Sequence, residues 1–258
     1  MPKLAANLSM LFTEVDFMDR FQAASAAGFD AVEYLFPYAF SAQDIRAQLQ
    51  KHGLVQALFN APPGDWAAGE RGIACIPGRE EEFRAGIATA LEYAKVLGNT
   101  RLHVMAGLMP DNIDQALATE TYVSNLRYAA QQVKEAGLTI LVEPINDIDM
   151  PGYFVNYQED GAALIDEIDE PNVRLQFDFY HCQMMQGNVL STFRKLRAYV
   201  DHVQIAGVPN RHEPDVGELN YRYLLAELDK DGYAGFVGCE YKPLAGTVDG
   251  LHWINKLT

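Results

Sequence analysis

The sequence predicts an α/β protein with a single (β/α)8 barrel over residues 1–258, and two patterns carry that prediction. Eight short apolar runs, typical of buried strands, alternate with eight longer segments whose apolar residues recur at helical spacing. A glycine closes five of the predicted helices just before the next strand, whereas the loops that leave several strands are long and polar. Short turns at one end and long loops at the other are characteristic of a (β/α)8 barrel. A doubly wound open sheet would carry a glycine-rich turn after its first strand, and residues 7–12 contain no glycine.

The N-terminal half contains residues that end or begin each predicted element. Gly28 closes a run of apolar residues at helical spacing and is a natural helix terminator. Pro37 stops the second strand, and Ser41 can cap the next helix, with Asp44 placing a negative charge near its positive end. The predicted strands are residues 4–10, 31–36, 54–60 and 102–107, and the predicted helices are residues 17–28, 41–53, 83–98 and 122–137.

The C-terminal half repeats this alternation. Its clearest strand is a run of β-branched and aliphatic residues that is entered from Gly137 and left through Pro144. Irregular stretches at residues 61–78, 146–157 and 208–217 follow three of the predicted strands, and loops of such length are usually lids or binding loops. The predicted strands are residues 138–143, 173–178, 202–207 and 236–240, and the predicted helices are residues 164–168, 189–199, 223–232 and 248–257, the last with Leu257 on its apolar face.

Four successive strands of the C-terminal half place an oxygen-bearing side chain near the end of the strand, namely Glu143, Asp178, Gln204 and Glu240. In a barrel these strand ends converge on one rim. Three carboxylates close together cannot all stay ionised without a cation, because like charges raise one another's pKa. Oxygen ligands favour Mg²⁺ or Mn²⁺ over zinc, which prefers thiolates. We therefore predict that these four residues bind a divalent metal.

Two of these carboxylates, Glu143 and Glu240, come from strands on different sides of the ring and could flank a substrate chelated by the metal. One would remove a proton from a carbon next to a carbonyl, and the other would return it. Polarisation of the carbonyl by the metal would bring this weakly acidic proton within reach of a carboxylate. Such an arrangement is typical of a ketose–aldose isomerase or an epimerase.

Three further residues are candidates for binding the substrate, and each has a structural alternative. His181 could hydrogen-bond a substrate oxygen, or it could cap or orient a neighbouring group. Arg211 could clamp a substrate carboxylate, since a guanidinium binds one through two parallel hydrogen bonds, or it could pair with Glu213 or Asp215. Lys242 could hold an anionic group or simply be solvated.

Five weaker candidates complete the predicted site. His103 is expected to contact the substrate, and like Glu33 it points toward the rim if the strand register is right; either could instead be a satisfied polar group of the core. Trp66, in the long third loop, could close over the substrate or pack against the top of the barrel. His212 and Asn7 carry weaker signals still.

Composition excludes several other classes of protein. The formal net charge of −15 disfavours binding to nucleic acid, and the sequence has no run of lysine or arginine. Cys75, Cys182 and Cys239 lack paired spacing, so neither disulfides nor a zinc knuckle are expected. Because side chains alternate along a strand, Cys239 should face away from the barrel interior that Glu240 faces. No basic-then-apolar N-terminal segment and no membrane-length run is present, so we expect a cytoplasmic protein without a membrane partner, with homo-oligomerisation left open.

Several of these stretches together resemble the hydroxypyruvate isomerase family, within the xylose-isomerase-like TIM barrels that also include tagatose 3-epimerase. The resemblance covers the whole chain. It rests on residues 5–10, 58–60, 103–107, 142–143, 176–178 with His181, 202–207, 211–214 and 238–243.

This resemblance implies roles for individual residues. Glu143 and Glu240 match the acid/base glutamates of the family, and its metal ligands match these two together with Asp178 and Gln204. The epimerase relatives have a histidine at the position of Gln204, so the glutamine indicates the isomerase branch. His181 and Arg211 resemble the substrate-binding histidine and arginine of those epimerases.

The implied reaction interconverts hydroxypyruvate and tartronate semialdehyde through an enediolate, and the implied partner is therefore a small carboxylated keto or aldehyde substrate. A close subgroup acts on 2-oxo-tetronates, which are one carbon longer, and the motif residues look alike in both. A ketose 3-epimerase is a further alternative on the same site. A zinc endonuclease of the same superfamily would need more histidine ligands and a basic groove, and a non-catalytic sugar-acid-binding barrel would have no need of two opposed carboxylates.

Overall fold

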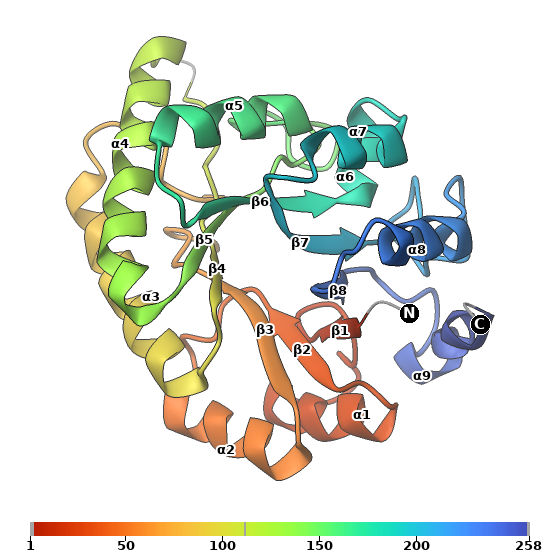
Figure 1. The fold of residues 1–258 in the computed structure, drawn as a ribbon. Helices are drawn as coiled ribbons and strands as arrows, with labels where there is room; N and C mark the ends of the chain where they lie inside the picture. The colour runs from red at the N-terminus through yellow and green to blue at the C-terminus, as the bar shows by residue number, and fades with distance from the viewer. Residues whose placement is uncertain (1–2, 111, 257–258) are drawn as a thin grey trace.

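Eight parallel strands close into a barrel in chain order in the computed structural model, which describes residues 3–110 and 112–256 (Figure 1). The eighth strand pairs with the first, with Leu4 opposite Val237, and this pairing completes the ring. The predicted (β/α)8 barrel is therefore confirmed. The strands are β1 Lys3–Asn7, β2 Ala31–Tyr34, β3 Val55–Asn60, β4 Arg101–His103, β5 Thr139–Val142, β6 Val173–Asp178, β7 Val200–Ile205 and β8 Phe236–Cys239.

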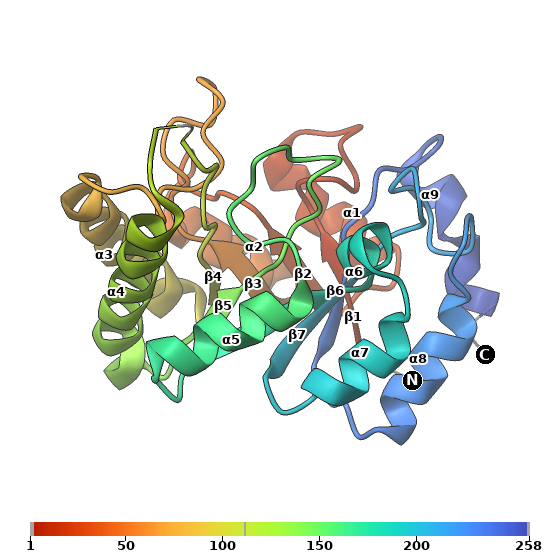
Figure 2. The same ribbon diagram turned by 90° about the horizontal axis from the view of Figure 1, so that it is seen from above.

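Helices surround the barrel, and the long loops rise on one side of it (Figure 2). Ser41 caps the second helix by accepting the backbone N–H of Asp44, as predicted, and Gly53 ends that helix with a φ of 66°, just before β3. The helices are α1 Arg20–Ala26, α2 Ala42–His52, α3 Glu80–Leu97, α4 Gln115–Val133, α5 Gln158–Ile168, α6 Phe179–Met185, α7 Val189–Leu196, α8 Tyr221–Lys230 and α9 Thr247–Gly250, with short 3-10 helices η1 Phe17–Asp19, η2 Lys134–Ala136 and η3 Leu251–Lys256.

The structure shifts several predicted bounds: the first strand, predicted at residues 4–10, ends at Asn7, and the helices predicted from residues 122 and 164 begin at Gln115 and Gln158. The strand predicted at residues 102–107 ends at His103, after which the chain enters a loop. The last helix, predicted for residues 248–257, is a single α-turn followed by a 3-10 helix, and Leu257 lies outside the described residues. Helix α6 was not predicted; it begins immediately after β6, because Asp178 accepts the backbone N–H of Tyr180 and so caps it.

Side chains alternate between two environments along each strand. Outward side chains form one apolar core between the strands and the helices, and Cys239 belongs to it, as the alternation predicts. Inside the barrel, a small cluster of Ala5, Ala31 and Ala57 fills the lower part. Polar residues of the same strand faces, such as Asn7 and Glu33, lie one step closer to the rim. The barrel interior is thus apolar below and polar above.

Within the described residues, no helix combines the length and the apolar character needed to cross a membrane.

Candidate active site

The predicted site residues lie where β5 to β8 end. Asp178 is the last residue of β6, Gln204 lies in β7, and Glu143 and Glu240 directly follow β5 and β8. All four side chains are buried. Buried carboxylates are costly unless they are paired or bind a cation, so their gathering at one end of the barrel marks a site for charged chemistry.

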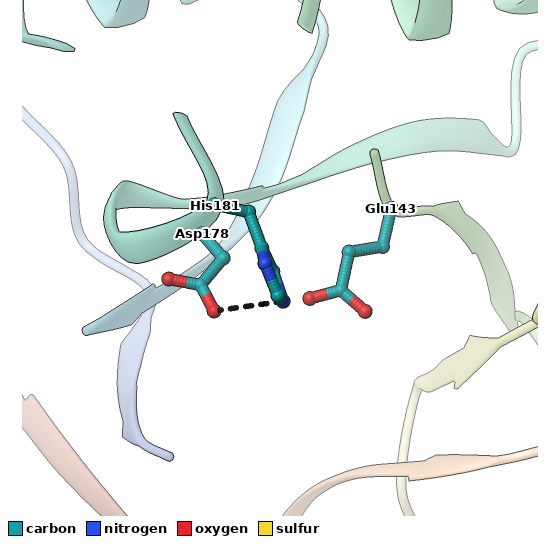
Figure 3. Close-up of side chains that lie close together, drawn as sticks. All are labelled: Glu143, Asp178 and His181. Atoms are coloured by element: carbon teal, nitrogen blue, oxygen red, sulfur yellow. Dashed lines mark ion pairs between the residues drawn. The ribbon is translucent and has the colours of Figure 1, made fainter. Parts of the chain in front are cut away.

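Glu143, Asp178 and His181 form the centre of the site, and each offers one ligand atom within 4.8 Å of the others (Figure 3). Glu240 reaches this group through Arg211, whose Nη2 lies 2.8 Å from Glu240 Oε2 and 3.8 Å from Asp178 Oδ2. The structure therefore brings together the three predicted carboxylates, the predicted histidine and the predicted arginine.

Charge in this group is poorly balanced by the protein itself. Burial, together with the charges of Glu240 and Asp178, raises the pKa of Glu143 well above its usual value. Burial raises the pKa of Asp178 to about 6 and that of Glu240 to about 7, in both cases against the opposing charge of Arg211. Glu143 Oε1 and Asp178 Oδ2 are buried without a hydrogen-bond partner among the described residues. Unpartnered carboxylate oxygens of this kind are suited to a divalent cation, so the residues present fit such an ion.

His181 is held in one tautomer by its neighbour Asn146. Its Nδ1 accepts the backbone N–H of Asn146 at 3.3 Å and lies 2.7 Å from Asn146 Nδ2. The side-chain oxygen of Asn146 accepts the backbone N–H of Asp149, so its NH₂ group faces the ring. Burial lowers the pKa of His181 well below its usual value, so the ring is neutral and carries its proton on Nε2. His181 therefore presents an N–H donor to the site, which suits a substrate oxygen better than a cation.

The amide of Gln204 is already engaged. Its Nε2 donates to Glu33 Oε1 at 2.7 Å, and its Oε1 accepts from Gln176 Nε2 at 2.6 Å. Because an amide oxygen has two lone pairs, Oε1 can still accept a second partner or bind a cation. Gln204 can therefore still act as a metal ligand, as predicted. Its amide also belongs to a hydrogen-bonded network with Glu33 and Gln176.

Arg211 does not form the alternative pairs that the sequence left open. Its Nη2 binds Glu240, and its guanidinium lies 5.0 Å from the centre of the Tyr180 ring. Glu213 instead accepts the backbone N–H of Leu244, and Asp215 pairs with Lys256. Arg211 therefore faces the centre of the site, where a substrate carboxylate could reach it.

The remaining candidates are spread around the rim. His103 is buried with its Nε2 3.6 Å from Glu143 Oε2, and burial lowers its pKa to about 3, so the ring is neutral. Lys242 has an exposed side chain. Trp66 packs against Phe36 and Arg71 on the third loop, with its ring 5.0 Å from the Phe36 ring.

Three polar residues of the site were missed or given little weight by sequence reasoning, namely Glu33, Gln176 and His202. Glu33 accepts hydrogen bonds from Asn7 and Gln204, and it contacts His202 Nε2 at 2.8 Å. A signal was present, since Gln176 and His202 each precede a predicted ligand by two residues. A spacing of two along a strand places both side chains on the same face.

Comparisons with known proteins agree with this architecture. Residues 21–257 match the family described as xylose isomerase-like TIM barrel. The chain is 57% identical over 254 residues to the 2-oxo-tetronate isomerase of Cupriavidus necator, covering 98% of both proteins. It is 44% identical over 255 residues to the hydroxypyruvate isomerase of Escherichia coli, covering 99% of both. A solved Brucella melitensis protein described as AP endonuclease, family 2, has a TM-score of 0.97 at 50% identity, covering 99% of both chains. The solved D-psicose 3-epimerase from Clostridium cellulolyticum shares the fold, with a TM-score of 0.78 at 18% identity. The match covers 99% of this chain and 92% of the epimerase.

Proposed function

Since this chain belongs to the xylose isomerase-like TIM barrel family, and within it to the group of hydroxypyruvate and 2-oxo-tetronate isomerases, we propose that it is a metal-dependent isomerase of a small 2-oxo acid. The observation that carries the proposal is the convergence of Glu143, Asp178 and Glu240 with Arg211 at the barrel rim. Carboxylates can transfer protons to and from carbon, and a guanidinium can hold the carboxylate of an acid substrate.

The reaction moves one hydrogen between neighbouring carbons. In hydroxypyruvate and in a 2-oxo-tetronate, the hydrogen on carbon 3 is acidified by the carbonyl at carbon 2. Its removal gives an enediolate. Protonation at carbon 2, together with transfer of the hydroxyl proton from the oxygen on carbon 3 to the oxygen on carbon 2, then leaves the carbonyl on carbon 3. A divalent cation held by Glu143 and Asp178, with Gln204 and Glu240 as further ligands, would supply Lewis-acid polarisation of the substrate carbonyl. We propose Mg²⁺ or Mn²⁺, because the donors are mainly oxygen atoms.

The protein groups divide the remaining work. Glu143 and Glu240 act as the acid/base pair. Their pKa values are raised toward neutral pH, and a group transfers protons most effectively when its pKa lies near the working pH. His181 donates its Nε2–H to a substrate oxygen. Arg211 holds the carboxylate with the N–H groups that Glu240 leaves free. The exposed Lys242 and the buried His103 are secondary candidates for substrate contacts.

The comparisons change the order of the two candidate substrates. Sequence reasoning placed hydroxypyruvate first, but the 57% identity to a 2-oxo-tetronate isomerase exceeds the 44% identity to a hydroxypyruvate isomerase. We therefore propose a 2-oxo-tetronate as the preferred substrate and hydroxypyruvate as the second. An endonuclease, which the description of the Brucella protein raises, is disfavoured by the net charge of −15 and by the acidic character of the rim. A cytoplasmic location stays a prediction, and the oligomeric state stays open.

The direct test is turnover of the Mg²⁺-loaded protein in deuterated water, with both acids measured side by side. We expect deuterium at the carbon that receives the proton, and a higher kcat/KM for the 2-oxo-tetronate. A higher value for hydroxypyruvate would keep the mechanism and reverse the substrates. Turnover of neutral ketoses but of neither acid would overturn the proposal in favour of an epimerase. Product without any solvent deuterium, at every conversion, would exclude an exchanging carboxylate pair.

Arg211→Ala should lower kcat/KM for the acid substrate, because the substrate carboxylate loses a charged partner that can form two hydrogen bonds with it. The lower kcat/KM should correspond to a loss of about 2–4 kcal/mol in transition-state stabilisation. Steady-state kinetics would measure the loss. Lys134→Ala, which removes an exposed positive charge in η2, is the control and should change little. An equal loss on a neutral ketose would contradict the assignment, since that substrate has no carboxylate for Arg211 to hold.

A further inference from the structure

A buried carboxylate lies beneath the site and contacts two of its residues. Glu33, in β2, has a fully buried side chain inside the barrel. Its Oε1 accepts Asn7 Nδ2 at 3.1 Å and Gln204 Nε2 at 2.7 Å, and its Oε2 lies 2.8 Å from His202 Nε2. Asn7 Nδ2 also lies 3.2 Å from Glu240 Oε1. Glu33 is therefore joined to one proposed ligand directly and to another through one intervening side chain.

The barrel wall is shaped to admit this carboxylate. Gly238, in β8, faces the interior beside it, and a Cβ at this position would lie 2.4 Å from both carboxylate oxygens of Glu33. Any larger residue would therefore collide with Glu33. A polar group that fills a space left by a glycine, and that makes several well-directed hydrogen bonds, is an ordered part of the structure.

We infer that Glu33 is a positioning residue that turns the amide oxygen of Gln204 toward the metal ligands, an inference that rests on the proposed function. The group that Gln204 directs at Glu33 is its NH₂, because Nε2 donates to Glu33 Oε1. The opposite end of the amide, Oε1, then points to Gln176 on β6, the strand that ends in Asp178. Without Glu33 the amide could rotate and present its NH₂, which has no lone pair for a cation.

Residues that hydrogen-bond to a metal ligand and so orient it usually contribute substantially to metal affinity. Their removal typically lowers that affinity by about 10–100-fold. The role assigned to Glu33 differs from a general effect of negative charge, which would also attract a cation. The two roles respond differently to conservative substitutions. Glu33→Gln removes the charge but keeps an acceptor oxygen at the same reach, whereas Glu33→Asp keeps the charge but shortens the reach.

The experiment measures the dissociation constant of Mn²⁺ for the full chain by competition with a chromophoric chelator, with a thermal melt of each variant to verify folding. If Glu33 positions Gln204, Glu33→Asp and Glu33→Met weaken Mn²⁺ binding by about 10–100-fold, and Glu33→Gln retains affinity within about fivefold. Gln56→Met serves as the control, because it removes another buried polar side chain, one that donates to the Leu58 carbonyl. Its affinity should match that of the parent.

A second arm asks whether Glu33 acts through Gln204. In a Gln204→Ala background the amide that Glu33 would orient is absent. Adding Glu33→Asp should then change the Mn²⁺ dissociation constant by less than about threefold. The inference is overturned if Glu33→Asp retains Mn²⁺ affinity while Glu33→Gln loses it. It is also overturned if Glu33→Asp weakens Mn²⁺ binding as much in the Gln204→Ala background as in the parent. It is also overturned if all folded Glu33 variants bind as the parent does. Failure of the parent itself to bind Mn²⁺ would refute the proposed metal site, whereas the other failures leave the proposed function intact.

Discussion

Removal of the metal should reduce isomerase turnover to the background rate, and Mg²⁺ or Mn²⁺ should restore it. The physical reason is that burial and mutual repulsion raise the pKa values of Glu143, Asp178 and Glu240, so these groups tend to hold protons when no cation is present. A protonated glutamate cannot accept a proton from carbon. Turnover of chelated and reconstituted protein measures the effect, and full activity of metal-free protein would remove the metal from the mechanism.

The same cause makes the stability of the metal-free protein depend on pH. Between roughly pH 4 and pH 7 these carboxylates bind more protons in the folded protein than in the unfolded chain, so their contribution to the free energy of unfolding falls as the pH rises through this window. The buried neutral His103 and His181 act in the opposite direction only below their ordinary pKa of 6.5, so the carboxylates dominate above it. We therefore expect a lower Tm for the metal-free protein near pH ~8 than near pH ~5.5. Added Mg²⁺ should raise Tm more at the higher pH, where the carboxylates are ionised. A metal-induced gain that is larger at the lower pH would contradict the proposed ligands.

Glu240→Gln should lower kcat by about 10²–10⁴-fold, because an amide of nearly the same shape cannot take up the proton that a carboxylate removes from carbon. The KM should change far less, since Arg211 and His181 remain to bind the substrate. Kinetics at saturating Mg²⁺ are needed to separate a loss of chemistry from a loss of metal, because Glu240 is also a proposed ligand.

A matched control for this substitution is Glu213→Gln, which changes another buried glutamate, one that accepts the backbone N–H of Leu244. Its kcat should stay near that of the parent. If Glu240→Gln kept a kcat within a few-fold of the parent at saturating metal, Glu240 would no longer belong to the acid/base pair.

The fold could be predicted because the periodicity of apolar residues and the position of helix-ending glycines are local properties of the chain. The candidate site followed from one further rule, that strand ends meet at one rim of a barrel. Glu143, Asp178 and Glu240 all end or directly follow their strands, so their meeting needed no knowledge of loop structure.

The contacts that tune the site could not be predicted in the same way. Asn146, in the loop after β5, sets the tautomer of His181, which lies in α6. Arg211 binds Glu240 and not Glu213, although Glu213 is much closer to it in the sequence, because the loop that carries Arg211 folds back over the site. These contacts depend on the three-dimensional course of two irregular loops. Glu33 was underestimated because its importance comes from partners on β1 and β7, which the sequence places far away.

The cap of helix α6 also orients a carboxylate of the site. Asp178 Oδ1 accepts the backbone N–H of Tyr180 at 2.8 Å, whereas Oδ2 is the oxygen that lacks a partner among the described residues. Asp178 therefore has two tasks, because Oδ1 begins the helix while Oδ2 faces the other site residues. If the site holds the divalent cation that we propose, the hydrogen bond that begins α6 would also fix the direction in which Asp178 offers Oδ2 to that cation.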